Sequence, residues 1–343
     1  MRAVRFHEHG GPEVLRLDDI GDPVPTAVQV KVAVKAVALN HLDLWLRKGL
    51  PGVRVALPKI GGCDIAGQVA SVGALCSRMK PGDPVLISPG ESCGQCAACL
   101  RGDDNLCRAY QIIGGYGRDG GFAEFICVPE VNCVPLPQGL TFAEAAAVPL
   151  TFLTAWNMLV QQARVRPGEQ VLVVAAGSGI GTAALQIARL FGARPIAAAG
   201  SPEKLTRAKA LGAEATIGPG QDLLQEIRRL TGKRGVDVIV EHVGGATWDQ
   251  LLPALAPGGR LVTCGATAGF DAKVDVRYLF SKQVSILGAF MGRKADLLEI
   301  VREVAAGRLR PVVDRTLPLA ACAEAQQLLE DRKVFGKVVL TLD

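Results

Sequence analysis

Several features of other protein classes are missing from this chain of 343 residues. No stretch of about 18 apolar residues is free of charge and glycine, so the sequence contains no candidate membrane-spanning helix. The first eleven residues, MRAVRFHEHGG, lack the apolar core of a secretory signal, and we therefore expect a cytoplasmic protein. Internal repeats and low-complexity segments are absent as well, which leaves an ordinary globular protein as the expectation.

Concentrated charge is missing too. The net charge of +5 comes from 38 Lys and Arg and 33 Asp and Glu residues that are mixed along the chain, with no basic block. Nucleic acid and acidic membrane surfaces bind such blocks, so neither is an expected partner, and we expect a small-molecule substrate. Histidine is scarce, with four residues that include His7 and His9, which leaves few imidazoles for a metal site.

Apolar residues, by contrast, make up 49% of the chain and supply ample material for a core in each of two domains. Residues 1–39 alternate and turn as antiparallel strands do. From residue 171 onward, short apolar runs alternate with helical patterns of about 10 to 15 residues, which is typical of parallel βαβ units. The sequence therefore predicts an α/β protein in which a β-rich part precedes a doubly wound parallel sheet.

The stretch Val171–Gly181, VLVVAAGSGIG, is the centre of the second part. Its aliphatic run predicts a strand buried on both faces, its glycines predict a tight turn, and the next residues continue at helical spacing. A helix that begins at such a turn points unpaired N–H groups and the positive end of its dipole at a bound phosphate. The motif departs from GxGxxG because Ala176 and Ser178 stand at its first two glycine positions, and a tight turn without a ligand is the alternative. The candidate pyrophosphate-binding residues are Gly177, Ser178, Gly179, Ile180 and Gly181.

Four of the ten cysteines cluster in CGQCAACLRGDDNLC, residues 93–107. Spacings of two, two and seven residues let four thiolates surround one tetrahedral Zn²⁺. An iron–sulfur cluster is the nearest rival, but its usual run has three residues before the last cysteine and a proline after it. Four thiolates leave no open coordination position, so we expect one structural zinc per chain, with reduced cysteines and no metal as the alternative. The predicted ligands are Cys93, Cys96, Cys99 and Cys107.

Together these features resemble the medium-chain dehydrogenase/reductases over essentially the whole chain, from the β-rich start to the closing FGKVVL (335–340). The cysteine segment is similar to that of the zinc-containing alcohol dehydrogenases. The resemblance implies a GroES-like β-rich catalytic domain plus a doubly wound parallel Rossmann domain, with the active site in the cleft between them. It also implies a homodimer or homotetramer, for which the apolar segment 284–290 is the candidate edge strand. The expected domains are residues 1–150 (GroES-like, with the zinc lobe 93–107), 151–288 (Rossmann, NADP(H)-binding) and 289–343 (completion of the catalytic domain).

The two branches of the family that the chain resembles differ in whether they hold a catalytic zinc. Alcohol dehydrogenases of the family hold a catalytic zinc with a Cys, a His in a GHE segment, and a Cys or an acid ahead of the nucleotide domain. The matching positions here are Asn40, Cys63 and Leu150. A catalytic zinc needs three protein ligands and an open position, and only one of these three residues is a metal ligand. Regrouping of His41, Cys63 and Asp64 around an ion is the alternative.

At the same places the chain reads Asn40-x-x-Asp43 and Gly62-x-Asp64-x-x-Gly67, which resembles the zinc-free quinone oxidoreductases. That branch passes hydride from NADPH to quinones and activated enones without a Lewis acid. The resemblance makes Asn40, Asp43 and Asp64 the candidate catalytic residues, with Asn40 donating a hydrogen bond to a substrate carbonyl. The alternative is structural: Asn40 and Asp43 cap a helix, and Asp64 forms hydrogen bonds within the cleft wall.

The second strand of the nucleotide domain bears on the choice of cofactor. NAD-selective sheets end this strand with an acid that binds the ribose 2′-hydroxyl, whereas PIAAAGSPEKL (195–205) has Ala199 there. A small residue leaves room for a 2′-phosphate that Ser201 and Lys204 can bind, so we expect NADP(H). Alternatively, Lys204 and Arg207 belong to the solvated face of the next helix.

Further residues are expected at the carboxyl edge of the sheet, where doubly wound proteins bind their ligand. His242 stands at this edge, and packing beside the cofactor is favoured there over acid–base catalysis. Thr154 is suited equally to the cofactor and to bracing its own helix. By resemblance, the residues around the nicotinamide are Thr154, Val243, Gly265, Ala266, Gly288, Ala289 and Phe290.

We therefore expect an NADP(H)-dependent oxidoreductase that transfers hydride to a quinone, enone or carbonyl compound without a catalytic zinc. Two alternatives stay open. One is a zinc-containing alcohol dehydrogenase with an atypical catalytic metal site, and the other is a non-enzymatic, crystallin-like nucleotide-binding protein.

Overall fold

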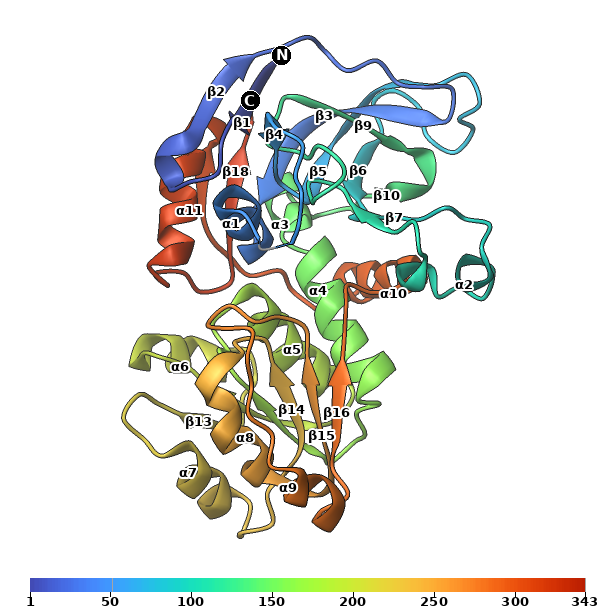
Figure 1. The fold of residues 1–343 in the computed structure, drawn as a ribbon. Coiled ribbons are helices and arrows are strands. Elements are labelled where there is room, and N and C mark those ends of the chain that lie inside the picture. The colour runs from blue at the N-terminus through green and yellow to red at the C-terminus, as the bar shows by residue number, and fades with distance from the viewer. Residues whose placement is uncertain (51, 343) are drawn as a thin grey trace. The chain divides into compact units, whose positions relative to one another are not determined.

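A computed structural model describes residues 1–50 and 52–342, and it divides the chain into two compact units (Figure 1). Unit 1 comprises Met1–Leu150, Arg293–Ala305 and residues 311–342, and unit 2 comprises Thr151–Gly292 and Ala306–Arg310. The first boundary lies at residue 150, where the sequence places one. The return to unit 1 begins at Arg293 rather than at residue 289, and the five residues 306–310 belong to unit 2.

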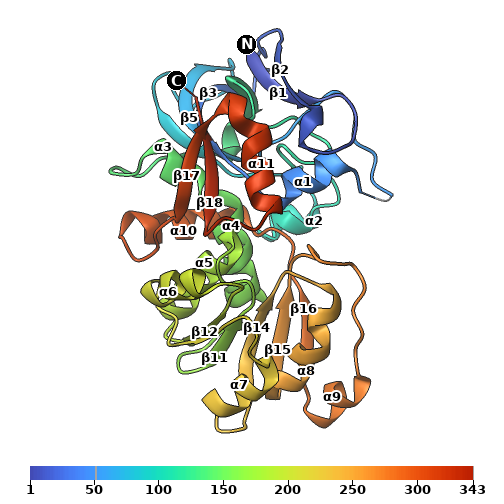
Figure 2. The same ribbon diagram turned by 90° about the vertical axis from the view of Figure 1, so that its left-hand side faces the viewer.

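Unit 1 is built on a seven-stranded sheet with the order β10-β6-β5-β3-β18-β17, in which β9 also pairs with β3. A second sheet has the order β2-β1-β4, and β7 pairs with β8. Because β18 lies between β3 and β17, the C-terminal segment completes the sheet that the N-terminal part begins, and both termini lie in this unit (Figures 1 and 2). The strands are β1 (Arg2–Phe6), β2 (Leu15–Asp19), β3 (Gln29–Ala38), β4 (Lys59–Ile60), β5 (Asp64–Val72), β6 (Pro84–Ile87), β7 (Gly90–Glu91), β8 (Gln111–Ile112), β9 (Phe125–Pro129), β10 (Cys133–Pro135), β17 (Val313–Pro318) and β18 (Lys337–Thr341).

The central strand β3 shows why this part of the sequence forms antiparallel sheet. In QVKVAVKAVA, the side chains of Val30, Val32 and Val34 are buried, whereas Lys31 and Lys35, at alternate positions on the other face, are only partly buried. Alternation with a period of two puts one face of the strand in the core and the other toward water. The alternating, antiparallel start predicted from the sequence is therefore present in β3, which pairs antiparallel with β5, β9 and β18.

Five helices belong to unit 1. The C-terminal helix α11 packs against β18 and against α1, so the last part of the chain covers the first. The helices are α1 (His41–Lys48), α2 (Ala97–Leu100), α3 (Phe142–Ala146), α10 (Lys294–Ala305) and α11 (Cys322–Glu330), with short 3-10 turns at Pro12–Val14, Asp104–Leu106, Glu130–Asn132 and Leu319–Ala321. A further helix, α4 (Pro149–Trp156), begins at the boundary and continues as a π-helix, Asn157–Gln162.

Unit 2 contains a six-stranded, entirely parallel sheet with the order β13-β12-β11-β14-β15-β16. The order reverses between β11 and β14, as it does in doubly wound dinucleotide-binding domains. The predicted α/β class with a doubly wound parallel sheet is therefore confirmed. The elements are β11 (Gln170–Val173), α5 (Gly179–Leu190), β12 (Arg194–Ala198), α6 (Pro202–Ala210), β13 (Ala215–Ile217), α7 (Leu223–Leu230), β14 (Val236–Glu241), a 3-10 turn (Gly245–Thr247), α8 (Trp248–Ala254), β15 (Leu255–Thr263), α9 (Val276–Ser281) and β16 (Ser285–Gly288).

Helices cover both faces of this sheet. The π-helix packs against α5 and reaches β15 and β16, whereas α7 packs against α8, which lies on β15 (Figure 2). Strands covered on both faces are rich in apolar side chains, and Val171–Val173 of β11 are all apolar and buried. All six residues of β14 are buried as well, including its two acids, Asp237 and Glu241. At the edge of the sheet, β16 is shorter than the predicted 284–290 and only partly buried.

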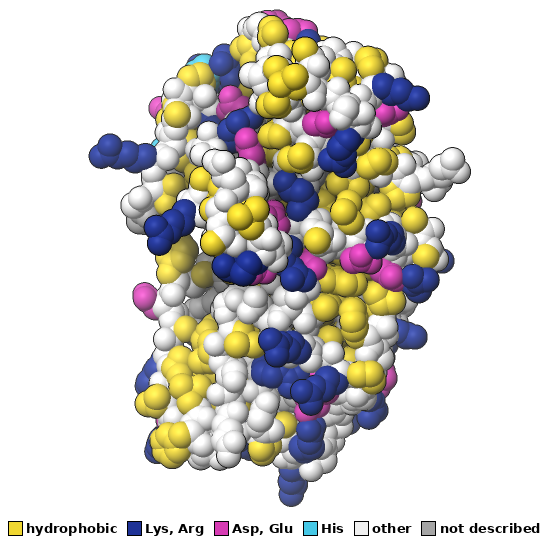
Figure 3. All heavy atoms as spheres, turned by 90° about the vertical axis from the view of Figure 1, so that its right-hand side faces the viewer, with side chains coloured by type: hydrophobic (Ala, Val, Ile, Leu, Met, Phe, Trp, Pro, Cys, Tyr) yellow, Lys and Arg dark blue, Asp and Glu magenta, His cyan; other side chains and the backbone are white. Residues whose placement is uncertain are grey.

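The surface carries charges of both signs. On the face drawn in Figure 3, Lys and Arg side chains lie among acidic and hydrophobic ones. Among the described residues, every helix is too short or too polar to cross a bilayer.

The guanidinium of Arg47 is a charged group that is nevertheless completely buried in unit 1. Arg47, at the end of α1, donates from Nε to Gln326 Oε1 at 2.6 Å and from NH1 to the carbonyl of Gly10 at 2.8 Å. Its NH2 pairs with the carboxylate of Glu330. These bonds join α1 to α11 and to the loop after β1, and a guanidinium with all these partners keeps its charge inside the protein.

We expect Arg47→Met to lower the free energy of unfolding by about 3–5 kcal/mol, because the substitution breaks a buried charge network and leaves Gln326 Oε1 and the carbonyl of Gly10 without this donor, while Glu330 keeps only Lys48, at 3.2 Å. Urea denaturation measures this difference. Arg302→Met is the control, since Arg302 pairs with Glu299 on the surface with both side chains at least half exposed, and its effect should stay within about 0.5 kcal/mol. Equal effects of the two substitutions would contradict this account.

Candidate functional site

The cysteine lobe of unit 1 is preformed. Sγ of Cys93 lies 3.9 Å from Sγ of Cys99 and 3.5 Å from Sγ of Cys107, and the sulfurs of Cys96 and Cys99 are 3.6 Å apart. All four sulfur atoms lie within 4.8 Å of one another. Four sulfurs bound tetrahedrally at about 2.3 Å from one zinc ion would be separated by about 3.8 Å. The observed spacing therefore fits a zinc ion ligated by all four predicted cysteines.

Local structure favours a thiolate at Cys93, whereas burial raises the pKa of the Cys99 thiol to about 11. Backbone N–H groups of Gln95 and Cys96 point at Sγ of Cys93 and lower the pKa of that thiol to about 6. Helix α2 begins directly after Cys96 and brings Cys99 back beside it. A zinc ion binds the deprotonated thiolate, so these contacts support the metal as well as the fold.

The glycine-rich turn of unit 2 follows β11, as predicted. Ser178 is the N-cap of α5, and its Oγ accepts a hydrogen bond from the backbone N–H of Gly181 at 2.9 Å. A Cβ on Gly181 would lie 2.6 Å from the carbonyl oxygen of Ala175, so this position requires glycine. Ala175 itself has φ of +49°, a left-handed conformation that glycine adopts more easily. The sharpest point of the turn is thus Ala175, one residue before the six positions that the sequence aligns with GxGxxG.

A fully buried carboxylate fixes the neighbouring loop after β14. Glu241 Oε1 accepts the backbone N–H groups of Val243 and Gly244 at 2.5 and 2.7 Å. Its Oε2 accepts from Trp248 Nε1 at 3.1 Å and from Thr263 Oγ1 at 3.0 Å. Because Thr263 ends β15, this one carboxylate ties the carboxyl ends of two strands together and sets the backbone that the sequence predicts beside the nicotinamide.

The other predicted cofactor residues of unit 2 lie at the same edge. Ser201 is the N-cap of α6 and accepts from the N–H of Lys204 at 3.3 Å. Thr154 is 4% exposed, and its Oγ1 has no hydrogen-bond partner among the described residues. The predicted residues Gly177–Gly181, Ser201, Val243, Gly265, Ala266 and Gly288–Phe290 all follow or end a strand of the parallel sheet, at the carboxyl edge.

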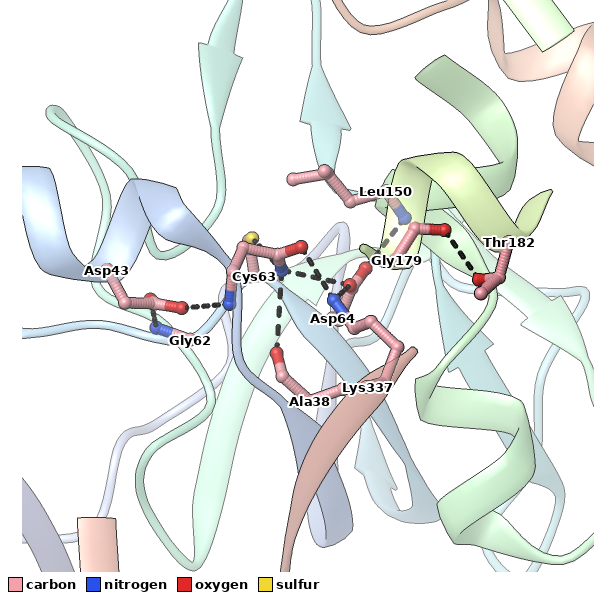
Figure 4. A network of polar contacts seen from close by, with 10 residues as sticks. Ala38, Asp43, Gly62, Cys63, Asp64, Leu150, Gly179, Thr182 and Lys337 are labelled. Atoms are coloured by element: carbon pink, nitrogen blue, oxygen red, sulfur yellow. Dashed lines mark hydrogen bonds and ion pairs between the residues drawn. The ribbon is translucent and has the colours of Figure 1, made fainter. Parts of the chain in front are cut away.

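Two of the three predicted catalytic residues of unit 1, Asn40 and Asp64, meet just after the end of β3 (Figure 4). Asn40 Nδ2 donates to Asp64 Oδ2 at 2.9 Å and approaches Cys63 Sγ at 3.3 Å. Lys337 Nζ donates to Asn40 Oδ1 at 2.6 Å and to Asp64 Oδ2 at 2.8 Å, and the backbone N–H of Leu150 donates to Asp64 Oδ1 at 2.7 Å. We call Asn40, Asp64 and Lys337 the amide–ion cluster.

The amide–ion cluster is shielded from solvent. The side chains of Lys337 and Asp64 are 4% and 0% exposed, and burial raises the pKa of the neighbouring Cys63 thiol well above its ordinary value. Burying a carboxylate is costly unless other groups compensate its charge and its lone pairs, and Asp64 has both an ion-pair partner and hydrogen bonds. Sequence reasoning did not assign Lys337, because its only signal is a lone lysine in an apolar strand, FGKVVL.

Asp43 has a separate position. One of its carboxylate oxygens accepts the backbone N–H of Asn40 at 2.7 Å, at the start of α1, and the other accepts the N–H of Gly62 at 2.9 Å. Burial raises the pKa of this carboxyl to about 6, and the two backbone N–H groups oppose that rise. These contacts are the ones expected from a helix cap, the structural alternative for Asp43.

Comparisons with known proteins agree with this architecture. The model of the alcohol dehydrogenase GroES-like domain matches residues 26–138, and the model of the zinc-binding dehydrogenase domain matches residues 179–306. A NAD-dependent alcohol dehydrogenase from Saccharolobus solfataricus is 33% identical over 99% of both chains. The quinone oxidoreductase of Homo sapiens is 30% identical over 100% of this chain and 98% of its own.

The chain belongs to the medium-chain dehydrogenase/reductase superfamily. A crystal structure of a NAD-dependent alcohol dehydrogenase superposes on the whole chain with a TM-score of 0.97 at 50% identity, and each chain is covered completely. Since its relatives include both alcohol dehydrogenases and quinone oxidoreductases, this medium-chain dehydrogenase/reductase is an oxidoreductase.

The superfamily raises the question of a second, catalytic metal ion. In this medium-chain dehydrogenase/reductase, the cysteine lobe is the one place among residues 1–50 and 52–342 where three or more His, Cys, Asp or Glu ligand atoms come together. His41, Cys63 and Asp64 do not form such a group. The amide nitrogen of Asn40 and the ammonium of Lys337 already bind Asp64 Oδ2, so the residues present do not fit a catalytic zinc there.

For the cysteine lobe we expect one zinc per chain, and we expect Cys99→Ala to release it, because three thiolates no longer close the coordination shell. Plasma emission spectrometry of the purified protein measures the zinc, and hydrogen exchange of residues 93–107 reports the loosening of the lobe. Cys127→Ala is the matched control, since Cys127 lies in β9 outside the lobe. Full zinc content in the Cys99 variant, with unchanged exchange, would contradict the assignment.

For Asp43 we expect stability to depend on pH in a stated direction. The folded-state pKa of Asp43, about 6, lies above the ordinary value of 3.8, so the folded protein favours the protonated carboxyl. The stabilisation of the folded state by this carboxyl is therefore fully present below pH 3.8 and is lost as the pH rises through 6. Relative to Asp43→Asn, the wild type should lose on the order of 2–3 kcal/mol of unfolding free energy between pH 4 and pH 7. Urea denaturation of both proteins across this range measures the difference, and a difference independent of pH would refute the assignment.

Proposed function

We propose that this protein is an NADP(H)-dependent oxidoreductase that reduces quinones or activated enones and uses no catalytic metal ion. The observation that carries the proposal is the amide–ion cluster. It stands where alcohol dehydrogenases of the superfamily are expected to hold a catalytic zinc, and its polar atoms already bind one another.

The charges of the cluster favour reduction without a Lewis acid. The carboxylate of Asp64 is neutralised by Lys337 in a water-poor environment, so a divalent ion entering here would have to displace a buried ion pair. Quinones and enones are electrophilic without metal activation, whereas oxidation of a simple alcohol needs removal of its hydroxyl proton. The cluster therefore suits an electrophilic acceptor better than an alcohol.

Asn40 is the proposed contact to the acceptor. Its Oδ1 accepts from the ammonium of Lys337, which polarises the amide and strengthens its N–H groups as donors. One N–H is held by Asp64 at 2.9 Å, while the contact of Nδ2 with the Cys63 thiol is longer, at 3.3 Å. The same nitrogen also lies 3.5 Å from the carbonyl oxygen of Ala38. A carbonyl oxygen that gains negative charge during the reaction is a stronger acceptor than a neutral thiol or this more distant carbonyl, so it can compete for the second N–H of Asn40.

Unit 2 supplies a suitable dinucleotide site. The N-terminus of α5 and the glycine-rich turn form the expected pyrophosphate position, and the buried hydroxyl of Thr154 lacks an internal partner that a bound amide can provide. When bound, the reduced nicotinamide supplies a hydride to the electrophilic carbon of the acceptor, and a proton from solvent completes the reduced product.

The NADP(H) preference rests on the end of β12. The residues after the strand are Ala199, Gly200 and Ser201, so the acid that selects NAD is missing from its usual position. The N-terminus of α6 and the Ser201 hydroxyl favour a negatively charged group at this place. The related alcohol dehydrogenases described above are named as NAD-dependent, so the preference needs a direct comparison of the two cofactors.

We expect the purified protein to oxidise NADPH with 1,4-benzoquinone or trans-2-hexenal, to bind NADPH more tightly than NADH, and to contain one zinc per chain. Absorbance at 340 nm, fluorescence titration and metal analysis measure these three quantities. Two zinc ions together with alcohol oxidation would favour the atypical alcohol dehydrogenase, whereas cofactor binding without turnover would favour the non-enzymatic alternative. Tighter binding of NADH would overturn the cofactor preference alone.

We further expect Asn40→Ala to lower kcat/KM for the enal by roughly 10- to 100-fold with an unchanged Kd for NADPH, because the substitution removes a donor to the developing oxyanion. Asn132→Ala is the matched control. Asn132 is also buried in unit 1, but its Nδ2 donates to the carbonyls of Ser88 and Gly90 and its Oδ1 accepts from Lys294, so only stability should fall. Equal losses of kcat/KM in the two variants would remove Asn40 from the mechanism.

A further inference from the structure

The hydroxyl of Ser178 has an unusual set of partners. Its Oγ accepts the N–H of Gly181 at 2.9 Å and also lies 2.9 Å from Nε2 of His242. A serine hydroxyl has two acceptor sites and one donor. If His242 donates as well, both acceptor sites are filled, and the hydroxyl proton can then only be donated outward, away from the protein's own groups.

The two residues meet because of the strand order. Ser178 follows β11 and His242 follows β14, and these strands are parallel neighbours at the reversal point of the sheet. Their turns therefore open at the same edge, beside the N-terminus of α5. Ser178 is partly exposed and His242 is 7% exposed, so the histidine lies behind the serine as seen from solvent.

His242 cannot easily turn away from Ser178. The preceding residue, Glu241, holds the backbone of Val243 and Gly244 through its buried carboxylate. The carbonyl of His242 accepts from Thr267 Oγ1 at 3.4 Å. The imidazole therefore stands on a backbone segment that is fixed on both sides, as a positioning residue requires.

We propose that His242 is a positioning residue of the dinucleotide site, which donates from Nε2 to Ser178 Oγ and thereby directs the Ser178 hydroxyl proton onto a pyrophosphate oxygen. This inference rests on the proposed function, because it assumes that the turn binds a dinucleotide. When both acceptor sites of the Ser178 oxygen are filled, the hydroxyl can form a further hydrogen bond only as a donor, and an anion is the preferred acceptor for its proton. Together with the N-terminus of α5, it adds a charge-assisted hydrogen bond that is already oriented before the ligand arrives.

The role differs from acid–base catalysis. His242 acts through Ser178 and contacts neither the hydride donor nor the acceptor, so its loss should weaken binding of the cofactor and leave the chemical step intact. One hydrogen bond to a charged oxygen corresponds to a change of roughly tenfold or somewhat more in Kd.

The test uses ADP-ribose, which carries the pyrophosphate and lacks the nicotinamide, in calorimetric titrations of the full-length protein. We expect His242→Leu and Ser178→Ala each to raise the Kd by roughly tenfold, and the double variant to bind no more weakly than Ser178→Ala alone. His242→Gln, which keeps an N–H donor at the position of Nε2, should restore binding close to that of the wild type. Thr141→Ala is the control for loss of a hydroxyl cap, since Thr141 caps α3 in unit 1.

Each outcome has one meaning. If the wild type does not bind ADP-ribose, the proposed function fails. If the wild type binds and His242→Leu binds equally well, or if the two single effects add in the double variant, the proposed role of His242 is overturned and the residue serves packing alone. Melting temperatures of all variants identify any that fail to fold. If His242→Leu fails to fold, Ser178→Ala decides, because an unchanged Kd in that variant shows that the Ser178 hydroxyl does not bind the pyrophosphate and overturns the proposal.

Discussion

A charged group buried inside a protein needs an opposite charge or hydrogen bonds from neighbouring groups, and in unit 1 this requirement links distant parts of the chain. Asp64 is fully buried and binds Lys337, Asn40 and the backbone N–H of Leu150. These partners come from β18, from the turn after β3, and from the start of α4. Removing any of these partners leaves the buried carboxylate of Asp64 without one of its hydrogen bonds or without its ion pair. The contacts of Asp64 therefore hold the N-terminal strands, the start of α4 and the C-terminal strand together.

Unit 2 meets the same constraint with another acid. Glu241 ends β14, a strand that is apolar apart from Asp237 near its start, and its carboxylate accepts four hydrogen bonds from neutral N–H and O–H groups. Hydrogen bonds to backbone N–H groups stabilise a carboxylate and at the same time shape the loop that donates them. The four donors that offset the desolvation of Glu241 therefore also shape the carboxyl edge of β14 and β15.

The two buried acids explain how one architecture serves different chemistry. In the function proposed above, the amide of Asn40 and the ammonium of Lys337 occupy the position of a catalytic metal in unit 1, and the acceptor needs no Lewis acid. In unit 2 the backbone is fixed in the form that dinucleotide-binding domains share. The cysteine lobe is a third, independent site, since four thiolates close the coordination shell of a zinc ion and leave no position for a substrate.

The sequence by itself determined the features that depend on neighbours along the chain. The aliphatic run before the glycines predicted β11 and α5, the alternation of Val30 to Val34 predicted an antiparallel strand, and the spacing of Cys93, Cys96, Cys99 and Cys107 predicted a four-thiolate cluster. Each is a local pattern whose period or spacing matches the geometry of one element or one ion. For the same reason the sequence located the carboxyl edge of the sheet, which follows from where each strand ends.

Only the tertiary structure decided which side chains meet across the sheet. Lys337 is 273 residues from Asp64 and Ser178 is 64 residues from His242, and no pattern along the chain relates either pair. Both contacts follow from strand order, because β18 and β5 flank β3 and because β14 lies beside β11. The left-handed backbone conformation of Ala175 could not be predicted from the motif either, because a φ of +49° at a non-glycine residue occurs only where surrounding contacts impose it.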